Sequence, residues 1–309
     1  YGDHRDLHKE YRRQRQMCIR DRNIVSLGAS ASLVSVVSDD SVGHELTTMV
    51  GDEPRVEPHL LLEPGRESTV KTRYVANGQQ LLRADLESTH DIASLSAENL
   101  MRVAADSLSD CDVVVVSDYA KGVCTPGLLA AVISAGREAG IPVIVDPAAT
   151  ADYRLYRGAT AVTPNRTETS GATGRVIGTI EDGLAAAAEL CERLDLDIAF
   201  VTLDSDGIAL ATAGDETCHV PTRRREVYDI TGAGDMVLAT IGLSAAAGCD
   251  PETMARLANT SGGLEVEQIG VVTVTRGEMI ADLLGGARSA REKIRDRETW
   301  AEVLTARRE

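Results

Sequence analysis

Aromatic residues and paired cysteines are scarce in this chain. Its 309 residues include one Phe, one Trp and seven Tyr, so the core has to be built from Val, Ile, Leu and Ala. The six cysteines are scattered and form no C-x-x-C pair, which is typical of reduced thiols and argues against a disulfide framework or a zinc site. No apolar run reaches transmembrane length, and the sequence has no signal peptide with an apolar core. These absences predict a cytoplasmic protein that does not associate with a membrane.

Basic residues are also few compared with acidic residues. Lys and Arg number 32 against 48 Asp and Glu, which gives a formal net charge of −16. Such an excess of negative charge argues against nucleic acid or an anionic membrane as a partner. If the chain binds an anionic ligand, positive potential has to be concentrated locally, through a few Lys or Arg, a cation or helix N-termini. The length suits one large α/β domain or two small ones.

The segment Asp229–Asp235, with the sequence D-I-T-G-A-G-D, is the most informative motif. Two glycines flank an alanine, so the backbone can turn tightly and present successive N–H groups. Residues 236–247 are small or apolar and predict a buried helix, whose N-terminus favours an anion. Asp235 would lie in its first turn, where a carboxylate beside a phosphate can deprotonate an acceptor hydroxyl. The phosphate would be held by the amides of Gly232, Ala233 and Gly234. The alternative is a glycine turn whose two Asp residues only cap the helix.

This motif resembles the D-x-T-G-A-G-D signature of the ribokinase-like (PfkB) carbohydrate kinases. Five further segments occur in the order expected for one subfamily, the kinase half of the bifunctional proteins of ADP-heptose synthesis. They are residues 79–83 (QQLLR), 117–122 (SDYAKG), 146–147 (DP), 156–160 (YRGAT) and 163–168 (TPNRTE). The resemblance covers about residues 23–284.

The resemblance implies a fold and an activity. The fold would be a three-layer α/β sandwich with a mostly parallel central sheet and a small β lid. The activity would be ATP- and Mg²⁺-dependent phosphorylation of D-glycero-β-D-manno-heptose 7-phosphate at C1, giving the 1,7-bisphosphate. Two alternatives remain open: another sugar kinase of ribokinase or phosphofructokinase specificity, and a truncated, non-catalytic scaffold that only binds nucleotide.

Apolar runs alternate with helical patterns from about residue 97 onward, which favours a parallel-rich sheet between helices. Residues 113–116 (VVVV) predict a strand buried on both faces. Polar residues follow four of the apolar runs, and ligands of such sheets bind beyond the carboxyl ends of the strands. We therefore expect Asp118, Asp146, Asn165 and Thr202 to line one edge. Residues 54–86 contain three strand-like runs and resemble the lid, with an ordinary edge hairpin as the alternative.

Further site residues follow from the resemblance. Asn165-Arg166-Thr167-Glu168 matches a family N-x-x-E motif in which Glu orders Mg²⁺-bound water and Asn reaches the nucleotide; Arg166 would add charge near the phosphates. The alternative is a capped helix start. Thr202 and Gly207 match a nucleotide-side T-x-G-x-x-G pattern, although Asp204 stands where many relatives have Gly. Other matched positions are Asn259 for the nucleotide, with a structural Asn as the alternative, and Asp229 and Thr231 for a monovalent cation, K⁺.

Basic residues are the candidates for binding the phosphate of the sugar. Lys121, close to Asp118 in D-Y-A-K-G, can attract an anion as a point charge. Lys71, Arg73 and Arg83 on the lid are further candidates. Structural ion pairs and solvated strand faces are the alternatives. Many relatives have Lys after Asp-Pro, where this chain has Ala148.

The two ends of the chain differ from its body. Residues 1–22 contain seven basic and four acidic residues without apolar periodicity, and M-C-I-R-D-R can be encoded by a transposon-end adapter used in sequencing libraries. We therefore expect a non-native segment, with a natural basic tail as the alternative. The first strand of the family and its sugar-gripping Asp and Gly-Gly motif would then be missing.

Residues 285–309 are expected to form a linker and the first helix of a truncated nucleotidyltransferase domain, with a simple C-terminal tail as the alternative. A homodimer formed through the lid is also expected.

Overall fold

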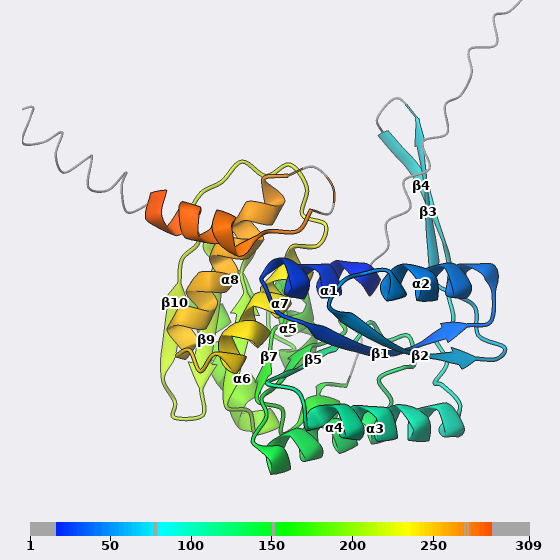
Figure 1. The fold of residues 1–309 in the computed structure, drawn as a ribbon. Helices are drawn as coiled ribbons and strands as arrows, with labels where there is room; N and C mark the ends of the chain where they lie inside the picture. The colour runs from blue at the N-terminus through cyan, green and yellow to red at the C-terminus, as the bar shows by residue number, and fades with distance from the viewer. Residues whose placement is uncertain (1–16, 77–78, 150–151, 269, 271, 286–309) are drawn as a thin grey trace, which may run out of the picture.

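The computed structural model describes residues 17–76, 79–149, 152–268, 270 and 272–285 (Figure 1). A six-stranded sheet has the order β10-β9-β8-β7-β6-β5. Strands β5 to β8 are parallel, β9 pairs antiparallel with β8, and β10 pairs antiparallel with β9. The bounds are β5 Val114–Ser117, β6 Val143–Asp146, β7 Ala161–Val162, β8 Ile198–Thr202, β9 Ile208–Thr212 and β10 Thr217–Val220.

Helices cover both faces of this sheet, as the period-two alternation of its strands requires. Val143 and Val145 of β6 pack into one core cluster, while Ile144 packs into the cluster on the opposite face. The first cluster includes side chains from α4 (Pro126–Ala139) and α6 (Ile180–Leu194), and the second from α7 (Ala233–Ala246) and α8 (Pro251–Val266). The expected mostly parallel sheet between helices is confirmed. Further described helices of the body include α3 Ser94–Leu108, α5 Arg166–Thr173 and the 3₁₀ turns η1 Tyr153–Tyr156 and η2 Asp204–Asp206.

Within the described residues, a second sheet contains β1 (Ala31–Ser38) and β2 (Val56–Glu63), paired in parallel. Helices α1 (Met17–Ser26) and α2 (Ser41–Gly51) belong to this part of the chain. The hairpin of β3 (Val70–Ala76) and β4 (Gln79–Leu86) projects from the body (Figure 1). The hairpin is shorter than the lid expected from the sequence, because the run at residues 60–62 lies in β2 and pairs with β1. The sequence also predicts a turn at Asn77-Gly78 between the last two strand-like runs, and these two residues lie outside the described ones.

A cavity of about 1560 Å³ separates the two sheets. Every residue of β1 and every residue of β5 contributes to its wall. Among the described strands, β5 pairs only with β6 and β1 only with β2, so the two open edges both border the cavity. The 113–116 run packs against a core cluster on each face, as predicted, but β5 is only half-buried because this edge strand lines the cavity.

None of the helices in the described ranges is long and apolar enough to cross a membrane. The cysteines at positions 111, 124, 191, 218 and 249 carry free thiols.

Candidate active site

The glycine motif lies where α7 begins. Gly232 is the N-cap with a φ of 100°, a left-handed conformation that glycine adopts without strain, and no side chain caps the helix. The first amides of a helix have no acceptor within the helix, which suits an anionic ligand, although the amide of Ala233 donates to the carbonyl of Ile230 at 3.4 Å. Asp235 lies in the first turn and is 7% exposed. The arrangement places a largely buried carboxylate beside a set of backbone donors.

Asp235 lies close to Asp146, at the end of β6, because Arg20 of α1 joins them. Nη2 of Arg20 is 2.5 Å from an oxygen of Asp235 and 3.2 Å from an oxygen of Asp146. The same atom donates to the hydroxyl of Tyr119 at 2.8 Å, and that hydroxyl donates to Asp235 at 3.3 Å. Burial raises the pKa of Asp146 to about 7, against the opposing effect of Arg20. Sequence reasoning missed Arg20 because it treated residues 1–22 as foreign to the fold.

The expected nucleotide side is held together by backbone contacts. Thr202 forms an isolated parallel bridge with Asn165, and its amide donates to the carbonyl of Pro164 at 2.9 Å. Gly207 has a φ of 96°, and a Cβ there would lie 2.2 Å from the carbonyl oxygen of Val220. That carbonyl also accepts from Nδ2 of Asn259 at 2.8 Å. The structure thus brings two groups close together: Asn165 with Thr202, and Gly207 with Asn259.

Asn165 and Glu168 form a capping box at the start of α5. The side chain of Asn165 accepts from the amide of Glu168 at 3.0 Å, and Oε2 of Glu168 accepts from the amide of Asn165 at 2.8 Å. The pKa of Glu168 is raised by burial, and these hydrogen bonds oppose the rise. The capped helix start that was weighed from the sequence is therefore present. Thr167 is exposed on the same helix.

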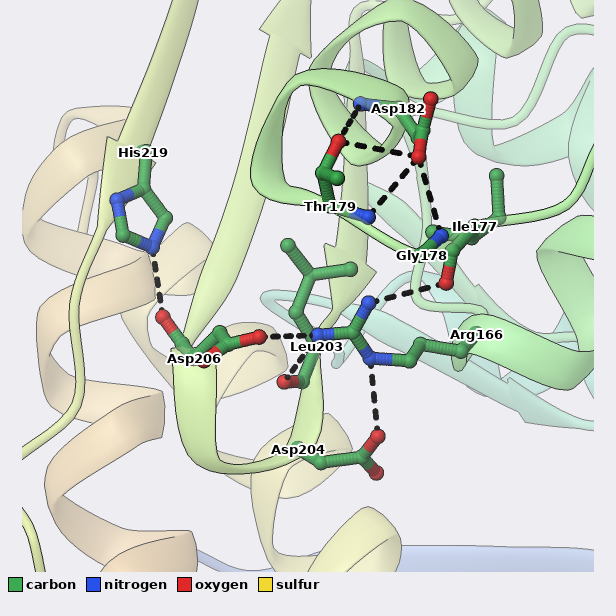
Figure 2. Close-up of polar contacts among 9 residues, drawn as sticks. All are labelled: Arg166, Ile177, Gly178, Thr179, Asp182, Leu203, Asp204, Asp206 and His219. Atoms are coloured by element: carbon green, nitrogen blue, oxygen red, sulfur yellow. Dashed lines mark hydrogen bonds and ion pairs between the residues drawn. The ribbon is translucent and has the colours of Figure 1, made fainter.

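The contacts of Arg166 do not favour phosphate binding, because carboxylates and backbone carbonyls surround its guanidinium (Figure 2). Its Nε lies 3.1 Å from Asp204, and its Nη2 pairs with the carboxylate of Asp206. Nη2 also donates to the carbonyl of Leu203 and Nη1 to that of Ile177, both at 3.1 Å. Asp204 has a φ of 51°, a conformation that favours Gly and tolerates Asp. This conformation explains how Asp can stand where many relatives have Gly.

The candidate sugar-side residues are mostly engaged with other protein groups. Asp118 accepts from the amide of Ala120 and from the hydroxyl of Tyr156, each at 2.7 Å. Nζ of Lys121 lies 2.6 Å from Glu87 at the base of the hairpin.

The basic residues of the hairpin are also not seen next to Asp235. Arg83 pairs with Asp85 at 3.0 Å. Lys71 borders the large cavity, and nothing is described for the side chain of Arg73. In the described part of the chain, no hydrogen bond or ion pair joins Lys71 or Arg83 to Asp235.

The loop before the glycine turn is tied to the C-terminal end of α8. The carboxylate of Asp229 accepts from the amides of Thr231 at 2.9 Å and Gly270 at 3.2 Å, while the amide of Tyr228 donates to the carbonyl of Val266 at 2.8 Å.

Glu265, one residue before Val266, is 1% exposed, and neither of its carboxylate oxygens has a hydrogen-bond partner in the described part of the chain. Burial, with Asp235 and Asp229 nearby, raises the pKa of Glu265 to about 8. The sequence signal that could have identified Glu265 was a lone Glu on an apolar helix face. Within the described ranges, no three His, Cys, Asp or Glu side chains are grouped so as to hold a metal ion.

Comparisons with known proteins agree on one family. The profile of the pfkB family carbohydrate kinases matches residues 22–276. The chain is 40% identical over 282 residues to the "Bifunctional protein HldE" of Acidiphilium cryptum, covering 91% of this chain and 57% of that protein. It is also 40% identical over 262 residues to the protein of the same name from Paramagnetospirillum magneticum, covering 85% and 54%. The chain thus spans little more than half the length of the curated relatives it matches.

Solved structures share the fold at low sequence identity. Phosphofructokinase-2 from Escherichia coli, in complex with potassium, superposes with a TM-score of 0.72 at 20% identity, covering 85% of this chain and 84% of that one. Ribokinase from Giardia lamblia gives a TM-score of 0.70 at 18% identity, with coverages of 86% and 87%. These likenesses identify a ribokinase-like fold.

Proposed function

The chain belongs to the pfkB family of carbohydrate kinases, and we propose that it phosphorylates D-glycero-β-D-manno-heptose 7-phosphate at C1 for ADP-heptose synthesis. The product would be the 1,7-bisphosphate, and the setting would be the cytoplasm. The observation that carries the proposal is the 40% identity to bifunctional HldE proteins over 91% of the chain. The order of the motifs at residues 79–83, 117–122 and 163–168 supports the same subfamily.

Asp235 is the proposed general base. The oxygen of the anomeric hydroxyl attacks the γ-phosphorus of ATP, the bond from that phosphorus to the β–γ bridging oxygen breaks, and the hydroxyl proton moves to the carboxylate of Asp235. The amides of Gly232, Ala233 and Gly234 would stabilise the charge on the transferred group, as helix N-termini do for anions. General-base catalysis of this kind contributes about 10²- to 10⁴-fold in rate. The burial of Asp235 in the first turn of α7 supports this role.

ATP and its Mg²⁺ would be held on the side of the sheet where Asn165 and Thr202 meet. Glu168 would hold Mg²⁺ through water, since carboxylate oxygens and retained waters suit this ion. Mg²⁺ would neutralise phosphate charge during transfer. Thr202, Gly207 and Asn259 would contact the nucleotide, and Asp118, Lys121, Lys71 and Arg83 the sugar phosphate.

A bound K⁺ would suit the loop of Asp229 and Thr231. The buried carboxylate of Glu265, which lacks a hydrogen-bond partner among the described residues, supports a cation there.

We further propose that residues 23–284 form the kinase domain, that residues 1–22 replace its natural beginning, and that residues 285–309 lead into a nucleotidyltransferase domain. Two observations support the first boundary. Asp21 is 6% exposed, and its Oδ2 has no hydrogen-bond partner among the described residues, an unfavourable position for a native carboxylate. The cavity between β1 and β5 has room for a further strand. The coverage of just over half of each HldE relative supports the second boundary.

The hairpin is the proposed dimer contact. Exposed apolar side chains gather on β2, β3 and β4, and burying them against a second copy would remove them from water. They are Leu62, Tyr74, Leu81, Leu82 and Leu86, each at least half exposed.

A substrate panel tests the proposed activity. ADP release would be measured with heptose 7-phosphate, ribose and fructose 6-phosphate, using a chain in which a relative's N-terminal segment replaces residues 1–22. Heptose 7-phosphate should give the highest kcat/KM, and ³¹P NMR should show a new phosphate at C1. Faster turnover of ribose or fructose 6-phosphate would overturn the assignment.

A further inference from the structure

One arginine joins three segments around the proposed nucleotide site (Figure 2). Arg166, the first residue of α5, reaches the 3₁₀ turn η2 (Asp204–Asp206), which follows β8. It contacts both carboxylates of that turn and the carbonyl of Leu203 at its start. Through Nη1 it also holds the carbonyl of Ile177, in the loop before α6. One guanidinium therefore has four acceptors on two loops.

The η2 turn needs such support. Asp204 and Gly207 both have left-handed backbone conformations, with φ values of 51° and 96°. Asp204 and Asp206 also place two carboxylates on one short turn of an acidic protein, where like charges repel. Arg166 offsets that repulsion with a planar group that can donate to several acceptors at once. Its side chain is 21% exposed, so solvent screens these ion pairs only in part.

Both ends of the turn adjoin residues of the nucleotide side. Thr202 precedes it and bridges to Asn165, the neighbour of Arg166 in sequence. Gly207 follows it and packs against the carbonyl of Val220. The carbonyl of Asp206 accepts a hydrogen bond from Nε2 of His219 on β10, at 2.6 Å. A displacement of this turn would therefore move Thr202 and Gly207 together.

We propose that Arg166 is a positioning residue, which holds the η2 turn through Asp204 and Asp206 so that the site binds Mg·ATP. The inference rests on the proposed function and deepens it. It replaces the expectation that Arg166 adds charge directly to the phosphates.

The two roles predict opposite signs for the same substitution. If Arg166 contacts phosphate directly, Asp204→Asn and Asp206→Asn remove competing negative charge and should tighten Mg·ATP binding. If Arg166 positions the turn, both substitutions loosen it and should weaken Mg·ATP binding. The expected increase in Kd is about tenfold for Arg166→Ala and severalfold for each Asp variant, as for residues coupled in one ion-pair network. The Kd would be measured by calorimetric titration of the full chain without sugar.

Three further measurements separate positioning from general stability. Arg175→Ala, which removes an exposed ion pair with Glu189 at 2.7 Å, serves as the matched control and should leave the Kd unchanged. Asp204→Asn should have no further effect on the Kd in the Arg166→Ala background. Arg166→Lys should restore little of the Mg·ATP affinity that Arg166→Ala loses, because one ammonium group cannot replace the planar guanidinium and its several donors.

Failure of the inference can be told from failure of the proposed function. Tighter or unchanged binding in the Asp variants would overturn the positioning role while leaving the kinase assignment intact. A lower melting temperature with an unchanged Kd would do the same. If Mg·ATP binds neither to the parent chain nor to the chain in which a relative's N-terminal segment replaces residues 1–22, both are overturned.

Discussion

The guanidinium of Arg20 lies 2.5 Å from a carboxylate oxygen of Asp235. It fills the space beside the proposed general base, stacks 4.9 Å from the ring centroid of Tyr119 and pairs with Asp146. The acceptor hydroxyl would have to displace the arginine to reach the carboxylate of Asp235. This contact leads to the first prediction.

The chain as given should bind Mg·ATP weakly and show almost no ADP release that depends on heptose 7-phosphate. One reason is the Arg20 contact. Another is that one wall of the sugar pocket is expected to be missing, so the two reactants would be poorly aligned. Loss of alignment can cost several kcal/mol of the reduction in the activation barrier. Replacing residues 1–22 with a relative's N-terminal segment that ends before Asn23 should restore turnover. Both chains would be assayed with and without the sugar. Full activity in the given chain would show that residues 1–22 are native.

Asp235→Asn, made in the chain with the restored N-terminus, should lower kcat at least about 10²-fold, because the amide cannot accept the hydroxyl proton. The Kd of Mg·ATP should stay within a few-fold, since the substitution keeps the shape of the side chain. Steady-state kinetics and titration would measure the two quantities. A kcat within tenfold of the parent would remove Asp235 from the role of base.

Glu168→Gln should raise the Mg²⁺ concentration needed for half-maximal activity, because a neutral amide orders metal-bound water less well than a carboxylate. Asp182→Asn is the matched control, since Thr179 and Asp182 form the second described capping box, at the start of α6. Both substitutions weaken a cap, which costs about 1 kcal/mol. If the two variants give the same metal titration, Glu168 serves only as a helix cap.

Asp21→Ala should stabilise the fold, and more at pH 8 than at pH 5. Burial raises the pKa of Asp21 to about 7 from its ordinary value of 3.8. Between these values the native state holds a proton that the unfolded state has released, so stability falls as pH rises to about 7 and then levels off. Melting temperatures of both chains at pH 5 to 8 would be compared. An equal difference at every pH would contradict the raised pKa.

The central part of the fold could be predicted because its signals are local. The run at residues 198–202 and the helical pattern at 181–194 carry their own periodicity, and they form β8 and α6. The glycine turn at Gly232 was likewise readable from residue type alone. Pairing was harder to predict, because β1 and β2 form a separate sheet through contacts between distant parts of the chain. The short strand β10 was missed, since residues 217–220 lack a clear apolar pattern.

Individual site contacts depended on tertiary placement. Arg166 could be assigned to the site from its motif. The four groups that accept hydrogen bonds from its guanidinium lie in loops 11 to 40 residues further along the chain, and no motif predicts them. The hydrogen-bond partners of Asp118 and the ion-pair partner of Lys121 likewise could not be predicted from a sequence pattern.

The cavity between β1 and β5 also determines which part of the native structure should unfold first. Backbone amides on the two bordering edges lack a neighbouring strand among those described, so hydrogen exchange there needs no global unfolding. Amides of β7 and β8, which have strands on both sides, should exchange only when the whole domain unfolds. The molecule would then behave as two cooperative units of unequal protection, with the proposed base, Asp235, at the start of a helix that packs against β5 and β6.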